Sequence, residues 1–178
     1  MGEYKLRETN RKELLNLVQR AFEGIELGNG ISLRETDVID NYGGEKARKA
    51  AKLQDERRNW TAIPYEDIAR YHWAYSWLDA EGFRYYLPAV MSWAIEESSK
   101  WDFDDSSLSS VLYCLTPHQR RRTTVRDDHF HALISLLSPP QRQAVQQFLW
   151  WLVSEFSDEE AFEALDLYWK NEPVAPVA

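Results

Sequence analysis

Residues 72–91, HWAYSWLDAEGFRYYLPAVM, constrain the fold more than any other stretch because they hold the densest group of aromatic side chains in the chain. Aromatic side chains bury large areas, so a segment of this kind is expected inside the protein rather than on its surface. The sequences on either side have the spacing of amphipathic helices, which need an apolar surface to pack against. We therefore expect residues 72–91 to form the centre of the core.

The pattern around this stretch predicts two helices that meet at Gly82. Pro64 suits the first position of a helix, and Gly82 suits the position just after its end. Pro88 would cost about 3 kcal/mol inside a helix, so residues 83–87 are expected to be a short connector. The sequence thus predicts helices over residues 64–78 and 88–97, packed as a hairpin.

The predicted join carries the first group of candidate binding residues, namely Asp79, Arg84, Tyr85 and Tyr86. One interpretation is a structural cluster in which these charges cap helix ends and hold the turn. The other is a small-molecule pocket, with Asp79, Arg84 and Tyr85 as its polar groups. We favour the structural interpretation, because charges at helix ends most often serve caps and helix dipoles.

The rest of the chain predicts further helices and one domain over residues 1–178, with a loose tail at 172–178. Helix-capping patterns precede several apolar stripes, including Ser32-x-x-Glu35 and Ser138-x-x-Gln141. A chain of this length usually forms one domain. The predicted fold is all-α, a bundle of about seven or eight helices.

Residues 118–136 are the exception, because an exposed loop and a short β-hairpin both fit them. If the segment were extended, Asp127, His129 and His131 would lie on one face, since side chains alternate along a strand. Two histidines and a carboxylate could then hold zinc or iron. In a helix the three residues would not share a face, and the site would not form.

Charge and composition exclude several classes of function. The formal net charge of −8 argues against binding the phosphates of a nucleic acid. There is a single cysteine, Cys114, so no internal disulfide can form. No apolar run reaches the ~20 residues needed to cross a membrane, and the first residues are too charged for a signal peptide. We therefore expect a cytoplasmic protein that binds neither a membrane nor a nucleic acid. We expect no cofactor either, since the sequence has no phosphate-binding loop and no nucleophile elbow.

Several segments together resemble an uncharacterised bacterial family of small helical proteins. They are residues 31–43, ISLRETDVIDNYG, residues 78–91, LDAEGFRYYLPAVM, and residues 137–145, LSPPQRQAV, with Phe148 and Leu149. The resemblance covers residues 10 to 155 and departs from the family pattern around 118–131. It implies a bacterial cytoplasmic protein and carries no activity that can be transferred to this chain.

The first functional hypothesis is a non-enzymatic, acidic protein that binds another protein. Trp150 and Trp151 motivate it, because a helix with one buried stripe cannot hide two adjacent indoles against a single neighbour. The alternative is that the last helix covers the second ring. An immunity or inhibitor protein against a basic enzyme would fit the size and the charge. The second hypothesis is an enzyme that uses Asp127, His129 and His131, or the pocket at Asp79, Arg84 and Tyr85.

Overall fold

The computed structural model describes residues 2–97, 106–117 and 128–171, with side chains from residue 10 onward. These residues form α-helices and short 3-10 helices and contain no β-strand, so the predicted all-α fold is confirmed. The α-helices are α1 (Gly2–Ala21), α2 (Leu33–Asp40), α3 (Glu45–Lys52), α4 (Tyr65–Arg70), α5 (Ala80–Glu97), α6 (Ser106–Leu115), α7 (Asp128–Ile134), α8 (Pro139–Phe156) and α9 (Glu159–Leu167). The 3-10 helices are η1 (Trp60–Ala62), η2 (His72–Trp77) and η4 (Trp169–Asn171).

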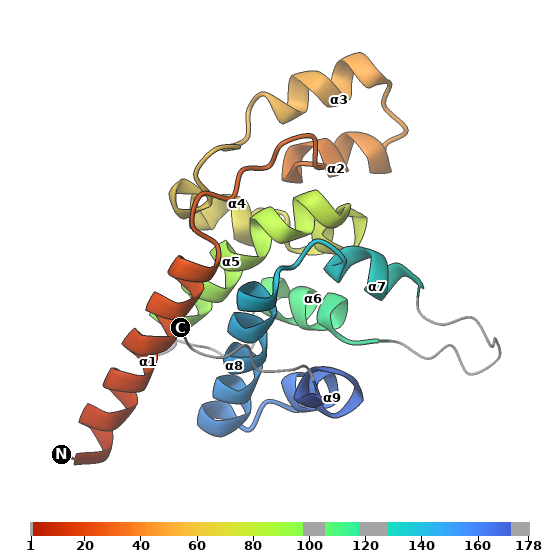
Figure 1. Cartoon of the computed structure of the whole chain (residues 1–178). Helices are drawn as coiled ribbons and strands as arrows, with labels where there is room; N and C mark the ends of the chain where they lie inside the picture. The colour runs from red at the N-terminus through yellow and green to blue at the C-terminus, as the bar shows by residue number, and fades with distance from the viewer. Residues whose placement is uncertain (1, 98–105, 118–127, 172–178) are drawn as a thin grey trace.

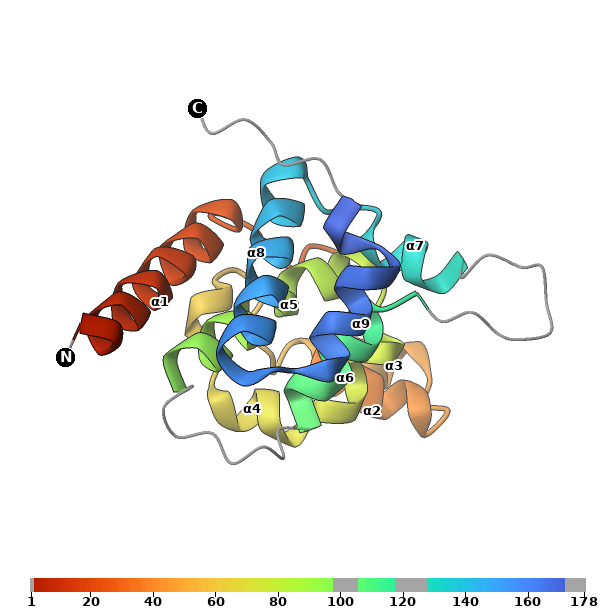
Figure 2. The ribbon, with the colours of Figure 1, turned by 90° about the horizontal axis from the view of Figure 1, so that it is seen from below.

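Helix α5 lies at the centre of the molecule, with α2 and α3 on one side and α6, α8 and α9 on the other (Figures 1 and 2). It packs against α1, α6 and α7, and η1 and α4 contact it as well. Most of its residues are buried on every face, from Gly82 to Ile95. A helix that is apolar all round belongs in the interior. The prediction that the aromatic stretch forms the core is therefore confirmed for residues 80–91.

The predicted join at Gly82 is wrong, because α5 begins at Ala80 and runs through the glycine. The cause is a cap at Asp79, whose carboxylate Oδ1 accepts a hydrogen bond from the N–H of Gly82 at 2.9 Å. The carbonyl of Asp79 also accepts from the N–H of Phe83 at 2.8 Å. The segment before it is not one helix either. Helix α4 ends at Arg70, and η2 follows from His72 to Trp77.

Pro88 lies inside α5, so the expected connector at 83–87 is helical instead. Its ring nitrogen cannot donate to the carbonyl of Arg84, which explains the usual cost of about 3 kcal/mol. However, Leu87, Val90 and Met91 are fully buried around it. Burying one such side chain contributes about 1.5–3 kcal/mol, so three together outweigh the proline.

A β-hairpin does not form in the described part of residues 118–136. Residues 128–134 are helix α7, while 118–127 lie outside the described residues. Phe130, Leu133 and Ile134 are buried at helical spacing, and α7 packs on α5 and α6. This spacing favours a helix over a strand. The predicted tail at 172–178 also lies outside the described residues.

Two tryptophans fasten distant parts of the chain through their indole N–H groups. Trp60 donates to the carbonyl of Phe22 at 2.8 Å, which ties η1 to the end of α1. Trp169 donates to the carbonyl of Leu115 at 2.7 Å, which ties η4 to the end of α6. Buried indoles usually find such a partner. These two hydrogen bonds therefore hold distant parts of the fold together.

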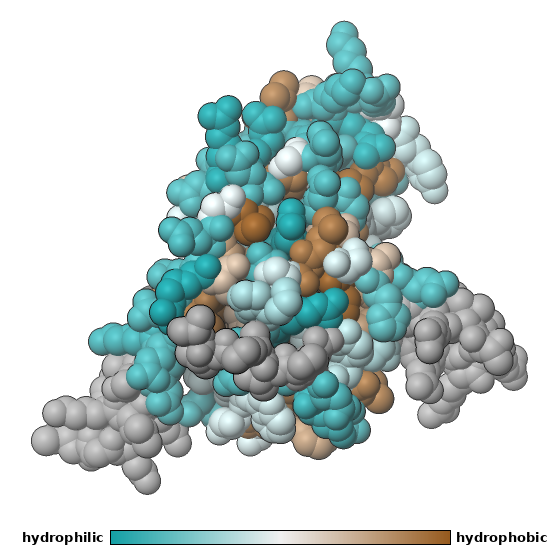
Figure 3. Space-filling view, in the orientation of Figure 1, coloured by the Kyte–Doolittle hydropathy of each residue, from teal (hydrophilic) through white to brown (hydrophobic). Residues whose placement is uncertain are grey.

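Helices α2 and α3 form an outer layer whose visible face is mainly hydrophilic, whereas hydrophobic residues gather nearer the centre of the view (Figure 3). Within the described ranges, no helix is both long and apolar enough to cross a lipid bilayer.

Candidate functional site

Asp79 has a structural role at the start of α5. Besides capping Gly82, its Oδ1 accepts a hydrogen bond from the N–H of Ile31 at 2.9 Å. One carboxylate oxygen thus holds the turn before α2 against the beginning of the central helix. This geometry agrees with the structural interpretation of the charges near residue 82.

Tyr85 and Tyr86 are buried in the core and do not form a surface with Arg84. The hydroxyl of Tyr86 accepts a hydrogen bond from the N–H of Leu33 at 3.4 Å. Burial raises the pKa of both phenols above the ordinary value, and for Tyr85 the carboxylate of Glu56 adds to this effect. Consecutive helix residues point in different directions, so residues 84–86 do not converge on one ligand.

His129 and His131 lie in α7, where they cannot share a face in the way that the metal hypothesis required. Helix residues turn by about 100° each, so side chains two apart point in nearly opposite directions. Both histidines are exposed, and Asp127 lies outside the described residues. In residues 2–97, 106–117 and 128–171, no three His, Cys, Asp or Glu side chains are grouped so that they could hold a metal ion.

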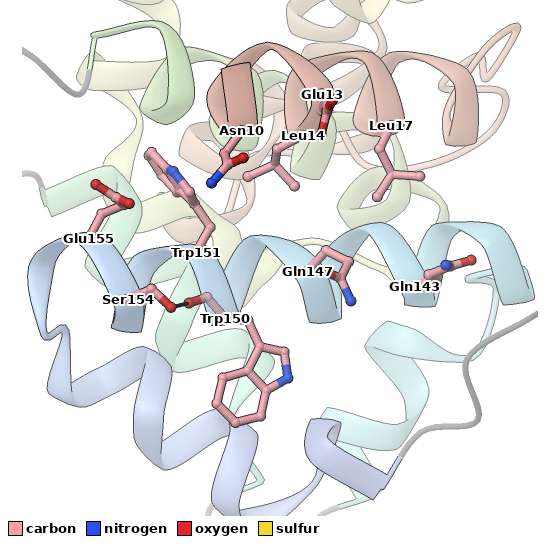
Figure 4. A pocket seen from close by; sticks show the side chains of 10 residues that line it. All are labelled: Asn10, Glu13, Leu14, Leu17, Gln143, Gln147, Trp150, Trp151, Ser154 and Glu155. Carbon is pink, nitrogen blue, oxygen red and sulfur yellow. Dashed lines mark hydrogen bonds between the residues drawn. The ribbon is translucent and has the colours of Figure 1, made fainter. Parts of the chain in front are cut away.

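Trp150 and Trp151, in contrast, border a groove of about 550 Å³ between α1 and α8. We call it the α1–α8 groove. From α1 it is lined by Asn10, Glu13, Leu14 and Leu17, and from α8 by Gln143, Gln147, Trp150, Trp151, Ser154 and Glu155. Figure 4 shows the two helices side by side with these residues between and around them. The groove thus joins residues that are far apart in the sequence.

The helical repeat explains why these residues meet. On α1 the lining residues recur at positions i, i+3, i+4 and i+7, and they share Leu14 with the buried stripe of Leu14, Val18 and Phe22. On α8 they flank a buried stripe that includes Val145, Leu149 and Leu152. When two such helices pack through their stripes, the neighbouring residues form the two banks of a groove.

The two indoles have different positions in this groove. Trp151 points toward Asn10 (Figure 4), and its ring packs on Phe148 and Phe156 at centroid distances of 6.0 and 5.3 Å. Trp150 points away from α1 and is 44% exposed. The last helix therefore leaves much of the Trp150 ring uncovered. Whether the ring binds a partner stays a prediction.

The charge of the α1–α8 groove is negative. Glu13 lies on the α1 bank and Glu155 on the α8 bank, and among the side chains described from residue 10 onward none that lines the groove is lysine or arginine. Three amides, from Asn10, Gln143 and Gln147, complete the polar rim. Arg11 and Lys12, the nearest cations in the sequence of α1, are not among the lining residues. The groove can therefore take an apolar ligand that carries positive charge.

A second group of charged residues forms a network that the sequence does not predict. Arg34 donates two hydrogen bonds to Asp67, at 2.7 and 3.1 Å, and also pairs with Asp55. The hydrogen bond to Asp67, with that to Asp55, raises the pKa of Arg34 above its ordinary value. Its guanidinium also lies 5.7 Å from the centroid of the Tyr71 ring. This network joins α2 to α4 and serves the fold.

Sequence reasoning found the tryptophans of the groove but missed the α1 bank. The signal was weak, because Asn10, Glu13 and Leu17 look like ordinary residues at the edge of an amphipathic helix. These residues come together with Trp150 and Trp151 only because α1 packs against α8.

Comparison with known proteins adds a family but no activity. No curated protein and no solved structure matches the chain. A model of a family of unknown function, DUF6714, matches residues 10–173, which include both banks of the α1–α8 groove. The chain therefore belongs to this family of unknown function, DUF6714.

Proposed function

We propose that this protein is a non-enzymatic binding module that takes a basic amphipathic helix of a protein partner into the α1–α8 groove. The observation that carries the proposal is the combination of an apolar floor with acidic banks. Leu14, Leu17 and Trp151 supply the floor, Glu13 and Glu155 supply the charge, and none of the described side chains that line the groove is cationic. An amphipathic helix buries its apolar face in such a groove and keeps its charges at the rim.

The shape of the groove supports a helical partner. Its lining residues on α8 extend from Gln143 to Glu155, which corresponds to about 18 Å at about 1.5 Å per residue. The bank on α1 extends from Asn10 to Leu17, about 10 Å, so the groove accommodates about two turns of a third helix against both helices and a third turn against α8 alone. The exposed ring of Trp150 lies at the edge, and tryptophan is among the residues that contribute most to protein interfaces.

The overall charge supports a basic partner as well. A net charge of −8 attracts a positive protein over a distance and speeds association, and this attraction weakens as salt is added. Within this proposal, the finer role is that of an inhibitor or immunity protein against a basic enzyme in a bacterial cytoplasm. The small size and the acidic surface support that role.

The test measures binding of a synthetic amphipathic helix of leucine and lysine, about 18 residues long. Gln147→Lys places a cation in the groove at an exposed position. We expect it to weaken binding at least about tenfold, or about 1.4 kcal/mol. Gln54→Lys is the matched control, because Gln54 is also exposed and lies outside the groove. It changes the net charge equally and should alter the Kd less than about twofold.

Fluorescence anisotropy of the labelled peptide gives the Kd, and circular dichroism confirms that each variant is folded. Equal weakening by both lysine substitutions would mean that the peptide senses only the overall charge. Absence of saturable binding to the unmodified protein would also overturn the proposal.

A further inference from the structure

A second groove lies on another side of α1 and shares no residue with the α1–α8 groove. It consists of two neighbouring cavities of about 640 and 180 Å³, which have Gln19, Trp60 and Thr61 in common. We call it the η1 groove. The larger cavity lies between the C-terminal half of α1 and residues 58–61, and the smaller one reaches α4 and α5. Together they are large enough for a small organic molecule.

One end of the η1 groove carries two arginines that form no ion pair within the described residues. The Nε of Arg20 donates to the carbonyl of Asn16 at 3.4 Å, which leaves the terminal nitrogens of its guanidinium available. Arg58 is exposed and lines the same cavity. Among the described residues that line this cavity, the only acid is Glu23. By contrast, Arg34 and Arg48 are each paired with carboxylates. Two guanidinium groups that line one cavity and form no ion pair are suited to an anion.

The other end is aromatic, and its rings already contact other parts of the fold. Tyr65 and Trp93 stack with their ring centroids 4.5 Å apart and an angle of 13° between the rings. Trp60 contributes to both cavities, and its hydrogen bond to the carbonyl of Phe22 fixes its orientation. These rings offer flat apolar contact without having to be ordered when a ligand binds.

A hydroxyl group without a partner lies among these rings. Ser92 is one of the residues around the smaller cavity, and its Oγ is buried and has no hydrogen-bond partner in the described parts of the chain. A buried polar atom is normally paired, so an unpaired one that lines a cavity points to a ligand group or a water as its partner. Glu96 is the acid at this end.

We propose that the η1 groove binds a small molecule that carries an anionic group on a flat, apolar ring system. Arg20 and Arg58 hold the anion, and Trp60 with the Tyr65–Trp93 pair contacts the rings. The hydroxyl of Ser92 bonds a polar substituent. This site is independent of the proposed protein-binding function, because the two grooves are lined by different residues.

The test uses two fluorescent probes of nearly the same shape. One is 8-anilinonaphthalene-1-sulfonate, which is anionic, and the other is N-phenyl-1-naphthylamine, which lacks the sulfonate. In the double variant Arg20→Ala and Arg58→Ala, we expect the Kd of the anionic probe to rise at least about tenfold. The Kd of the neutral probe should change less than about twofold. Arg57→Ala is the matched control, since Arg57 is exposed, adjacent in sequence and outside the groove.

A further variant tests the ring end of the groove. Trp93→Leu should weaken both probes, whereas Trp150→Ala in the α1–α8 groove should weaken neither. Circular dichroism and a urea transition check that every variant is folded, because partly unfolded proteins also bind the anionic probe. An unchanged Kd for the anionic probe in the double arginine variant would overturn the proposal. So would equal losses for the two probes, since the arginines would then act only through the structure.

Discussion

Arg34 shows how one side chain can hold a layer of helices in place. Its guanidinium reaches Asp55, which follows α3, and Asp67 in α4. The Asp55 side chain is 4% exposed, so its charge depends on this partner. Removing one member of a buried ion pair leaves the other charge unpaired. This costs more free energy than the intact pair contributes to stability.

We therefore expect Arg34→Gln to reduce the free energy of unfolding by about 2–3 kcal/mol, discounted because Arg34 itself is partly exposed. The measurement is a urea transition at pH 7. Arg70→Gln is a matched control, since both guanidinium groups lie 5.7 Å from the centroid of the Tyr71 ring. Arg70 forms no ion pair within the described residues, so its loss should matter less than about 0.5 kcal/mol. Equal effects of the two substitutions would show that the carboxylate network contributes little.

Trp150 tests the proposed function at the level of a single side chain. Trp150→Ala should weaken binding of the leucine–lysine peptide by about 1–2 kcal/mol, because an exposed indole at the edge of an interface loses contact area. Trp77→Ala is the control, since Trp77 in η2 is 45% exposed against 44% for Trp150 and lies outside the groove. Fluorescence anisotropy compares the two Kd values. A larger loss with Trp77→Ala would place the contact on another face.

At the scale of an element, Gly82 shows how a residue that usually ends a helix can lie inside one. The sequence predicts Gly82 just after the end of a helix, yet it lies in the first turn of α5 with no positive φ. A Cβ atom at this position would lie 2.4 Å from the carbonyl oxygen of Ile31. The glycine is therefore needed because the chain before α2 passes very close to α5.

Gly82→Ala should consequently destabilise the protein by about 2 kcal/mol or more, although alanine is better than glycine inside a helix by about 1 kcal/mol. Urea unfolding measures the change. Gly44→Ala is the control, because Gly44 has no atom within 4 Å of the added Cβ and has a φ of −75°. Gly44 is the N-cap of α3, a position where alanine is less favourable than glycine, so we expect a loss of about 1 kcal/mol or less, well below that of Gly82→Ala. A stabilising effect of Gly82→Ala would contradict the close approach.

At the scale of the whole molecule, the buried thiol and phenol groups of the core predict how the free energy of unfolding changes at alkaline pH. Burial raises the pKa of the Cys114 thiol from 9.0 to about 12 and raises the pKa values of Tyr85 and Tyr86 above 10.0. In the unfolded chain these groups lose their protons at their ordinary values, while the folded protein keeps them. Stability from this source is fully present below pH 9 and is lost as the pH rises toward 12.

The free energy of unfolding, measured in urea at several pH values, should therefore fall between pH 9 and pH 11. Cys114→Ala should flatten the part of the decline that begins near pH 9, and Tyr85→Phe the part that begins near pH 10. A free energy that stays constant up to pH 11, or a slope that both variants leave unchanged, would show that these groups are not protected by the fold.

The sequence by itself determined the helical class, several helix boundaries and the aromatic core. The helix predicted from Ser138 onward was found as Pro139–Phe156, and the side chain of Gln141 accepts from the N–H of Ser138 at 3.0 Å. Such features are local, because capping bonds and helical periodicity involve residues three or four apart. The exposure of one indole in the Trp150–Trp151 pair was also readable, since it follows from the width of a single helical stripe.

Only the tertiary structure decided where Gly82 and Pro88 lie and which residues form the grooves. The role of Gly82 depends on Ile31, and the α1–α8 groove depends on two helices separated by most of the chain. Pro88 is tolerated because its neighbours are buried by other helices. In each case, the free energy of contacts between distant residues outweighs a local preference that the sequence shows plainly.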